Sequence, residues 1–165
     1  MDSDVLILPG RCIGKLCLDD AKSMVRAKLG SPAFNKALFS PSEVGMWSVS
    51  ESRKVDHIFI TYFKGRVADI HITSDLFKTK DGISTLSKFN DVRAAYPSGE
   101  EVPYAIFESA HNRVDWIVKE QGITFSIAKD TEGPIIRIAI HKIGKAKAVG
   151  YSDREDWYWY PNKQQ

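Results

Sequence analysis

The chain resembles itself when it is shifted by 67 positions. At this offset residues 25–29 align with residues 92–96 without a gap, and Leu16 aligns with Ile83. Further along, at the same offset, Ile58 aligns with Phe125 and Ile60 with Ile127. After one extra residue in the second hairpin loop, Ile70 aligns with Ile138 and Ile72 with Ile140. A fixed period of this kind is the sequence signature of a repeated structural unit. The sequence therefore predicts two tandem units, at about 10–75 and 80–143, in a single domain 1–165 that ends in a C-terminal arm, 144–165.

Each unit is predicted to contain one short amphipathic helix. Ala21, Val25 and Leu29 recur every four residues, which places them on one face of a helix, with Met24 beside them in the same buried stripe. In the second unit, Phe89, Val92 and Tyr96 form the corresponding stripe before Pro97. Each helix should therefore bury one stripe against the rest of the unit.

Residues 56–63 and 67–73 alternate apolar and polar side chains around a turn at Gly65, which predicts a β-hairpin. Pairing residues whose numbers sum to 130 puts Ile58 opposite Ile72, Ile60 opposite Ile70 and Tyr62 opposite Ala68, all on one buried face. A slip by one residue would mix Asp69 into that face, which burial forbids. The outer face of the hairpin then carries His57, Phe59, Asp69, His71 and Thr73.

Further strands are predicted around residues 44–49, 102–108, 113–119, 122–128 and 135–142. Two short helices, each leading into an antiparallel run of strands, indicate the α+β class. We expect the helices to pack on one face of the sheet.

The two cysteines, Cys12 and Cys17, leave alternatives open. In an extended strand they would point to opposite faces, about 16 Å apart, which is too far for a disulfide. A turn through Gly14 would bring them together. The sequence favours two free buried thiols over a disulfide, and a metal site would need more ligands than these two residues provide.

Composition excludes several classes of protein. The net charge is +2, and basic residues are scattered among acidic ones, so we expect no nucleic-acid partner. No apolar run approaches the roughly 18 residues of a membrane span. The first residues lack the basic and apolar regions of a signal peptide. We expect a periplasmic or secreted protein if a signal peptide has been removed, and a cytoplasmic one otherwise.

Residues 13–32 resemble a short bacterial motif in which a strand and a turn lead into a helix ending in Leu-Gly-x-Pro. The motif occurs in small outer-membrane assembly lipoproteins and in the tandem repeats of β-lactamase inhibitory protein. Residues 73–84 resemble the joint of two-repeat bacterial envelope proteins. The resemblance covers about residues 10–143 and implies a binding scaffold, often outside the cytoplasm, with no catalytic residues.

The sequence contains no motif of a hydrolase, a phosphate-binding loop or a paired-cysteine metal site. We therefore expect no catalytic residues, no cofactor and no metal. The best remaining cluster for an enzyme or a metal site is His57, Asp69 and His71 on the outer face of the hairpin, although zinc normally takes three or four ligands. Solvated or partly covered side chains are the simpler interpretation of these three residues.

Four consecutive aromatic residues stand near the C-terminus. Trp157 and Trp159 share one side of a strand, and Tyr158 and Tyr160 share the other. One pair can then pack on the domain while the other contacts a partner, since Trp and Tyr are enriched at binding hot spots. With His57, Phe59 and His71, these residues make up the predicted partner-binding set.

The predicted function is a non-enzymatic protein-binding module, a monomer or weak homodimer, with an unidentified protein partner. One alternative is an inhibitor or immunity protein that blocks a partner enzyme. Another is a small enzyme or metal site on the face that carries His57, Asp69 and His71.

Overall fold

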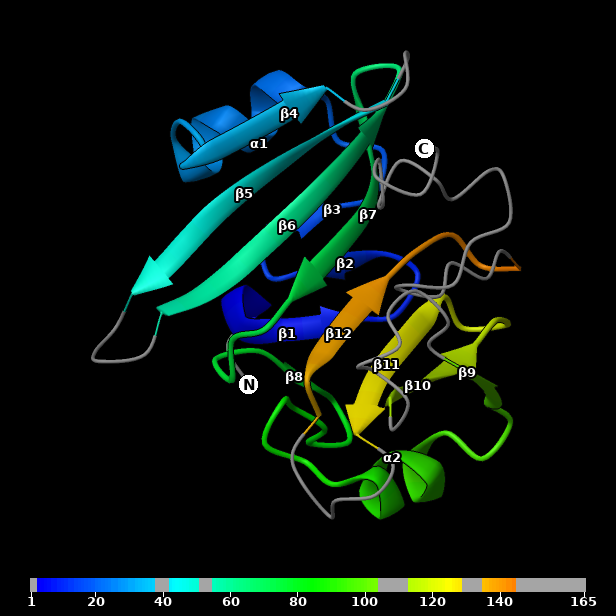
Figure 1. Ribbon diagram of the computed structural model, residues 1–165. Helices are drawn as coiled ribbons and strands as arrows, with labels where there is room; N and C mark the ends of the chain where they lie inside the picture. The colour runs from blue at the N-terminus through cyan, green and yellow to red at the C-terminus, as the bar shows by residue number, and fades with distance from the viewer. Residues whose placement is uncertain (1–2, 38–41, 51–54, 104–112, 129–134, 145–165) are drawn as a thin grey trace.

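The computed structural model describes residues 3–37, 42–50, 55–103, 113–128 and 135–144. Its main element is an antiparallel sheet of eight strands in the order β4-β5-β6-β7-β12-β11-β10-β9 (Figure 1). The strands are β4 (Phe34–Ala37), β5 (Ser42–Ser50), β6 (Val55–Phe63), β7 (Arg66–Ile72), β9 (Glu100–Pro103), β10 (Arg113–Val118), β11 (Ile123–Ala128) and β12 (Arg137–Ile140). At the centre β7 pairs with β12, with Ile70 opposite Ile140 and Ile72 opposite Ile138. The sheet is therefore continuous across both halves of the chain.

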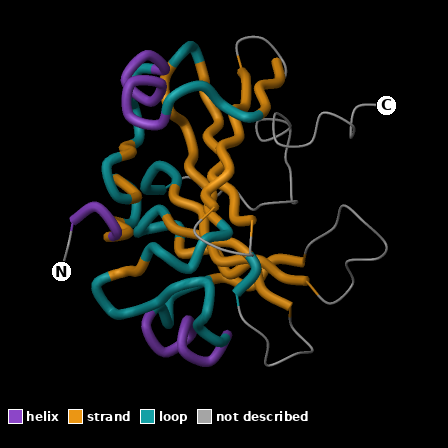
Figure 2. Tube along the Cα trace, turned by 90° about the vertical axis from the view of Figure 1, so that its left-hand side faces the viewer, coloured by secondary structure: helices purple, strands orange, loops and turns teal. Residues whose placement is uncertain are grey.

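A second, smaller sheet has the order β3-β2-β1-β8. Its strands are β1 (Leu6–Leu8), β2 (Cys12–Ile13), β3 (Leu16–Cys17) and β8 (Lys78–Thr79), and β8 runs parallel to β1. The small sheet, the helices α1 (Lys22–Leu29) and α2 (Phe89–Ala95) and the 3-10 turn η1 (Ser3–Val5) all lie on the same side of the large sheet (Figure 2). We call the face of the large sheet on that side the inner face.

The core lies between the two sheets. Alternate residues of the large sheet point into it and are buried: Ile58, Ile60, Ile70, Ile72, Ile123, Phe125, Ile127, Ile138 and Ile140. The small sheet contributes Ile7, Ile13 and Leu16 to the same cluster. The period-2 alternation places each of these side chains inward without breaking a ladder hydrogen bond.

The predicted register of the β6–β7 hairpin is confirmed for Ile58 opposite Ile72 and Ile60 opposite Ile70. The prediction for Tyr62 is wrong, because it lies opposite Val67 instead of Ala68. The register shifts between Thr61 and Tyr62, where the strand is irregular. An irregularity of this kind inserts an extra residue into one strand and cannot be seen in the alternation on either side of it.

The predicted α+β class, with two repeats of a helix followed by strands and with the helices covering the sheet, is also wrong. The described residues contain twelve strands and two short α-helices, so the fold is mostly β. Each helix has a single fully buried residue, Val25 in α1 and Val92 in α2. The small sheet covers the part of the inner face that the predicted helices were expected to cover.

A tryptophan of the large sheet holds the C-terminal end of each helix. Trp47 Nε1 of β5 donates a hydrogen bond to Gly30 O, 3.2 Å away, and Trp116 Nε1 of β10 donates one to Tyr96 O at 2.9 Å. These carbonyls lack partners inside their helices, so the indoles both satisfy them and fix the helix ends. None of the helices in the described parts of the chain is long and apolar enough to cross a membrane.

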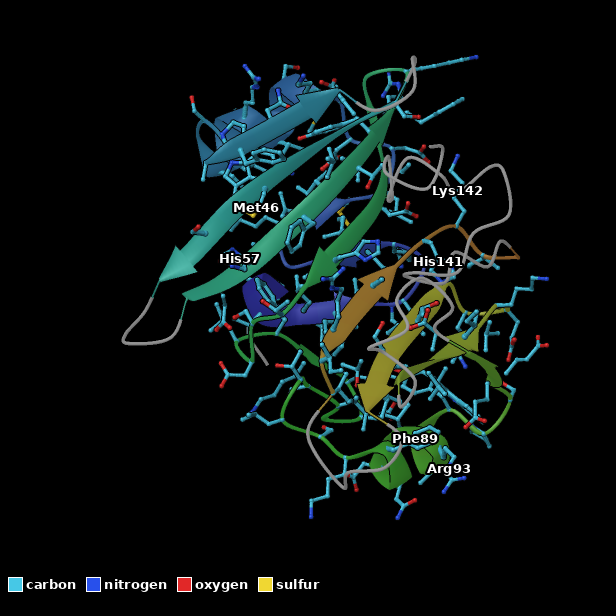
Figure 3. The ribbon with its side chains drawn as sticks, viewed as in Figure 1. Met46, His57, Phe89, Arg93, His141 and Lys142 are labelled. Carbon is cyan, nitrogen blue, oxygen red and sulfur yellow. A yellow bond between two sulfur atoms is a disulfide. The ribbon has the colours of Figure 1, made fainter. Side chains whose placement is uncertain are left out.

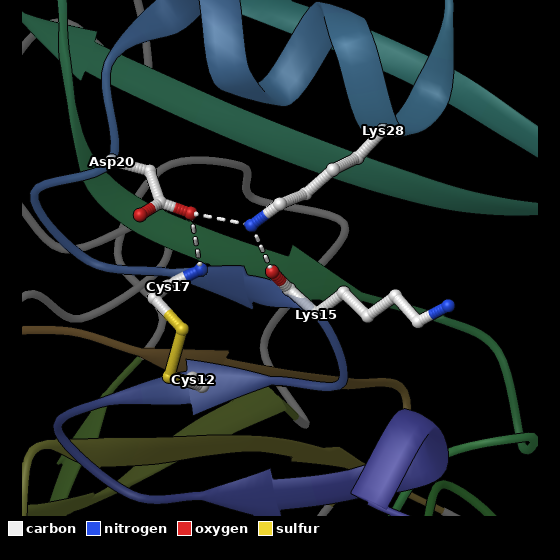
Figure 4. Close-up of a disulfide and its surroundings, with 5 residues drawn as sticks. All are labelled: Cys12, Lys15, Cys17, Asp20 and Lys28. Carbon is white, nitrogen blue, oxygen red and sulfur yellow. Dashed lines mark hydrogen bonds and ion pairs between the residues drawn. A yellow bond between two sulfur atoms is a disulfide. The ribbon is translucent and has the colours of Figure 1, made fainter.

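Cys12 and Cys17 form a disulfide, contrary to the favoured prediction of free thiols. The turn at Gly14 and Lys15 folds β2 back on β3, so that the two cysteines lie directly opposite each other with their Cα atoms 4.0 Å apart. Figure 4 shows that Asp20 continues the link toward α1. Its Oδ2 accepts hydrogen bonds from Cys17 N and from Lys28 Nζ.

Removal of the disulfide by Cys12→Ser with Cys17→Ser should lower the free energy of unfolding by about 2 kcal/mol, because the bond closes only a short loop in the unfolded chain. Urea unfolding of the variant measures the loss. Wild type in a thiol reductant should show a similar drop in its midpoint. A midpoint that does not change in either case would contradict a stabilising role for the bond.

Candidate functional site on the outer face of the sheet

The face of the large sheet turned away from the small sheet, here the outer face, is the candidate site (Figure 3). A single row of directly opposed residues crosses the sheet from β4 to β9. In order it contains Phe34, Met46, Phe59, His71, Ala139, Thr124, Ile117 and Glu100. The outer face has an aromatic half on β4, β5 and β6 and a polar half on β7, β12, β11 and β10.

The aromatic half is partly open. Phe34 is 49% exposed at the end of the row, on β4, which pairs with β5 alone among the described strands. Met46 and Phe59 follow it across β5 and β6, and both are half-buried. We call Phe34, Met46 and Phe59 the aromatic strip.

Two polar side chains border the aromatic strip. The guanidinium of Arg137, from β12, lies over the Phe59 ring with Cζ 5.2 Å from the centroid. The His57 ring also contacts the Phe59 ring, with centroids 5.8 Å apart and the two planes tilted. Phe59 thus contacts a cation and an imidazole on a face that a partner can reach.

The polar half of the outer face is buried. Asp69 and His71 on β7 are each 1% exposed, and Asp115 on β10 is 0% exposed. Thr61, Thr124, Ser126 and His141 are buried on the same face. A sequence of polar residues on one side of a strand ordinarily indicates a solvated surface, so this burial is the main departure from the expected site.

Asp115 is a buried carboxyl group on this face whose pKa is raised. Ser126, directly opposite on β11, donates a hydrogen bond from Oγ to Asp115 Oδ1 at 2.7 Å. Asp115 Oδ2 has no hydrogen-bond partner in the described part of the chain. Burial raises the pKa of Asp115 to about 7, against the opposing effects of the Ser126 hydroxyl and the positive charge of Arg137. A carboxyl group with this pKa changes between its protonated and ionised forms near neutral pH.

Thr124 and His141 form a second buried pair. Thr124 Oγ1 and His141 Nε2 are 2.8 Å apart, and His141 Nδ1 lies 3.3 Å from Lys142 O. A neutral imidazole has one donor and one acceptor nitrogen. In the tautomer with Nδ1 donating to the carbonyl, Nε2 accepts from the threonine hydroxyl.

The predicted site residues are distributed unequally. His57 and Phe59 lie on the aromatic half, where a partner can reach them, whereas His71 is buried directly opposite Phe59. Trp157, Tyr158, Trp159 and Tyr160 lie outside the described residues. The simpler interpretation of Asp69 and His71 as solvated or partly covered side chains is wrong, because both are buried. In the described ranges no group of three or more His, Cys, Asp or Glu side chains is arranged to hold a metal ion.

Three residues of the aromatic half and its border were not predicted from the sequence: Phe34, Met46 and Arg137. Met46 falls in a predicted strand, but Trp47 beside it is equally apolar, so the pattern did not say which of the two points outward. Arg137 joins the site through the pairing of β12 with β7, which no local pattern indicates. The alternation of Arg137 with Ile136 and Ile138 does indicate that Arg137 points away from the core. It does not indicate which strands lie beside β12.

No protein-family model matches the chain, and no curated protein matches it either. Among solved structures, it is similar to an extracellular protein containing an SCP domain from Bacillus anthracis, at 10% identity and a TM-score of 0.49 over 76% of this chain. A cysteine-rich secretory protein from Staphylococcus aureus gives 5% identity and 0.49 over the same share. The chain spans 44% of the length of each of these two proteins.

The uncharacterised protein YfeY from Escherichia coli is similar at 12% identity and a TM-score of 0.49, over 84% of this chain and 99% of that one. Similarities at this level do not transfer a function, and a shared architecture alone would not do so either. The functional argument therefore depends on the outer face itself.

Proposed function

We propose that this chain is a protein-binding module with no catalytic activity of its own, and that its partner docks on the aromatic strip. The observation that supports this most is the line formed by Phe34, Met46 and Phe59, which face outward on three neighbouring strands and end at a half-exposed phenylalanine. Aromatic residues, methionine and arginine are enriched at protein interfaces. Arg137, stacked on Phe59, adds the side chain most often found with aromatics at binding hot spots.

The burial of Asp69 and His71 favours this proposal over an enzyme or metal site on the same face. A catalytic side chain must touch the reacting atoms, and these two groups have almost no exposed surface. An inhibitor or immunity protein would be a special case of the proposal in which the partner is an enzyme. The strip itself does not favour an enzyme over any other protein.

The disulfide supports a location outside the reducing cytosol, since such bonds persist in oxidising compartments. We therefore place the module in the periplasm or outside the cell. The partner would then be a protein of the same compartment.

Photo-crosslinking tests the proposed surface. A benzophenone side chain at position 34 should form adducts with one defined protein in an extract of the source cells. The same group at Leu86, which is 63% exposed in the loop before α2, is the matched control for an apolar side chain away from the strip. Adducts should be several-fold more abundant at position 34.

The partner identified in this way should then lose affinity for the Phe34→Ser, Phe59→Ser double variant by about tenfold to a hundredfold, as expected for the loss of two aromatic contacts. Leu86→Ser should bind as wild type does. Equal labelling at the two positions, or equal binding by the double variant, would show that the aromatic strip is not the docking surface.

A further inference from the structure

Arg137 lies midway between two groups on the outer face. Counting strands from β12, Asp115 on β10 is two strands away in one direction, and Phe59 on β6 is two strands away in the other. Ser126 is directly opposite both Asp115 and Arg137, so these three share one row across the sheet. Phe59 belongs to the neighbouring row, which contains His71 and Ala139.

The side chain of Arg137 is long enough to reach either group. Two strand spacings separate the Cα atoms of Asp115 and Arg137 by about 10 Å, a span that the two side chains cover together. In the structure the guanidinium rests on Phe59, and Asp115 Oδ2 has no hydrogen-bond partner in the described residues. The charge of Arg137 nevertheless acts on Asp115, because it is one of the influences that lower the pKa of that carboxyl.

We propose that Arg137 is shared between Phe59 and Asp115, and that deprotonation of Asp115 moves its guanidinium from the aromatic ring to the carboxylate. The reason is the difference between the two contacts. A cation over a partly exposed ring gains little, whereas a buried carboxylate without a counter-charge is costly. While Asp115 keeps its proton the ring contact is sufficient, and once the proton has left for solvent the ion pair is preferred.

Other charged groups near Asp115 do not replace Arg137 in this role. On β9, Val102 lies directly opposite Asp115, and Glu100 of the same strand is an exposed acid that repels a second negative charge. On β12, His141 is held by Thr124 and the Lys142 carbonyl. Asp69 and His71 of β7 lie one strand beyond β12, and β10 itself begins with Arg113. Arg66 on β7 and Arg137 on β12 are the arginines of these strands whose side chains the structure describes, and of these two Arg137 is the one that lowers the pKa of Asp115.

The switch would regulate the proposed binding surface, and in that respect it depends on the proposed function. With Arg137 on Phe59, the aromatic strip presents a cation to the partner. With Arg137 on Asp115, it presents a bare ring. A partner that carries a carboxylate would therefore bind better below neutral pH than above it.

The side-chain motion can be tested without any partner, so its failure is distinct from failure of the proposed function. In isotope-labelled protein, NMR follows the Asp115 carboxyl carbon, the Arg137 Nε–Hε group and the Phe59 ring through the pKa of about 7. All three signals should shift with one common midpoint. In Asp115→Asn, which preserves the shape of the side chain, the Arg137 and Phe59 transitions should vanish.

Ser126→Ala is the second variant. Loss of its hydrogen bond should raise the midpoint of Asp115 by about one pH unit, and the Arg137 and Phe59 signals should move with it. The proposal is overturned if Asp115 titrates while Arg137 and Phe59 do not respond, or if the transition persists in Asp115→Asn. It is equally overturned if the Ser126→Ala midpoints separate from one another.

Discussion

Gly122→Ala should lower the free energy of unfolding by about 2–5 kcal/mol, the sum of a left-handed backbone and an overpacked contact. Gly122 has φ +73, a conformation that side chains disfavour. A Cβ at this position would lie 2.3 Å from His141 O and 2.8 Å from the Gly10 Cα. Gly122 O also accepts hydrogen bonds from the backbone N–H groups of Gly10 and His141. The residue therefore stands where the two sheets and the end of β12 meet, and none of these backbone atoms can move alone.

Gly65→Ala is the matched control. Gly65 also has a positive φ, +74, and its carbonyl also accepts a hydrogen bond, from Lys22 N, but a Cβ there would meet nothing within 4 Å. Its cost should be about 1–2 kcal/mol, from the backbone conformation alone. Urea unfolding of both variants measures the difference. Equal losses would mean that the contact between the sheets at Gly122 is not tight.

Asp115→Asn should remove a loss of stability that wild type suffers as the pH rises. Below the usual aspartate pKa of 3.8, Asp115 is protonated in both the folded and the unfolded state and costs nothing. Above that value the unfolded chain releases the proton first, while the folded protein keeps it up to about pH 7, so the free energy of unfolding falls across this window. The total loss is about 4 kcal/mol and is complete above pH 7. An asparagine does not ionise and avoids it.

The measurement is the free energy of unfolding of wild type and variant at several pH values from 4 to 8.5, compared as a difference at each pH. Subtraction cancels the other titrating groups, because both proteins contain them. The difference should grow in favour of Asp115→Asn through the window and then level off. A difference that is constant with pH would show that Asp115 titrates normally and is not buried as the structure has it.

The hairpin of β6 and β7 shows how far sequence patterns reach. Burial of one face requires every second side chain to be apolar, so the alternation in residues 56–63 and 67–73 predicted both the strands and the pairing of Ile58 with Ile72. His57 and Phe59 were placed on the outer face for the same reason. The irregularity at Thr61 and Tyr62 and the closing of the Cys12–Cys17 hairpin were not predicted, because each depends on one local backbone choice that leaves no periodic signal.

The share of the sheet that the helices cover was predicted wrongly for a related reason. Val25 and Val92 of the predicted stripes are fully buried, but Met24, which was predicted to be buried beside Val25, is 47% exposed. A stripe shows that a helix packs on something, but not how much of a sheet it covers. The strands β1, β2, β3 and β8 are two or three residues long, too short for a pattern to emerge, and together they build the layer that the helices were expected to form.

By itself, the sequence determined the properties that repeat along a strand or a helix: where most of the long strands run, which of their side chains face the core, and which residues anchor each helix. Only the tertiary structure decided which strands are neighbours. The pairing of β7 with β12 brings Arg137 to Phe59, 78 residues away along the chain, and sets His71 beside Ala139, 68 residues away. It also decided that Asp115 is buried. The burial of a polar side chain cannot be predicted from the local sequence, because the free energy of that burial depends on atoms contributed by distant parts of the chain.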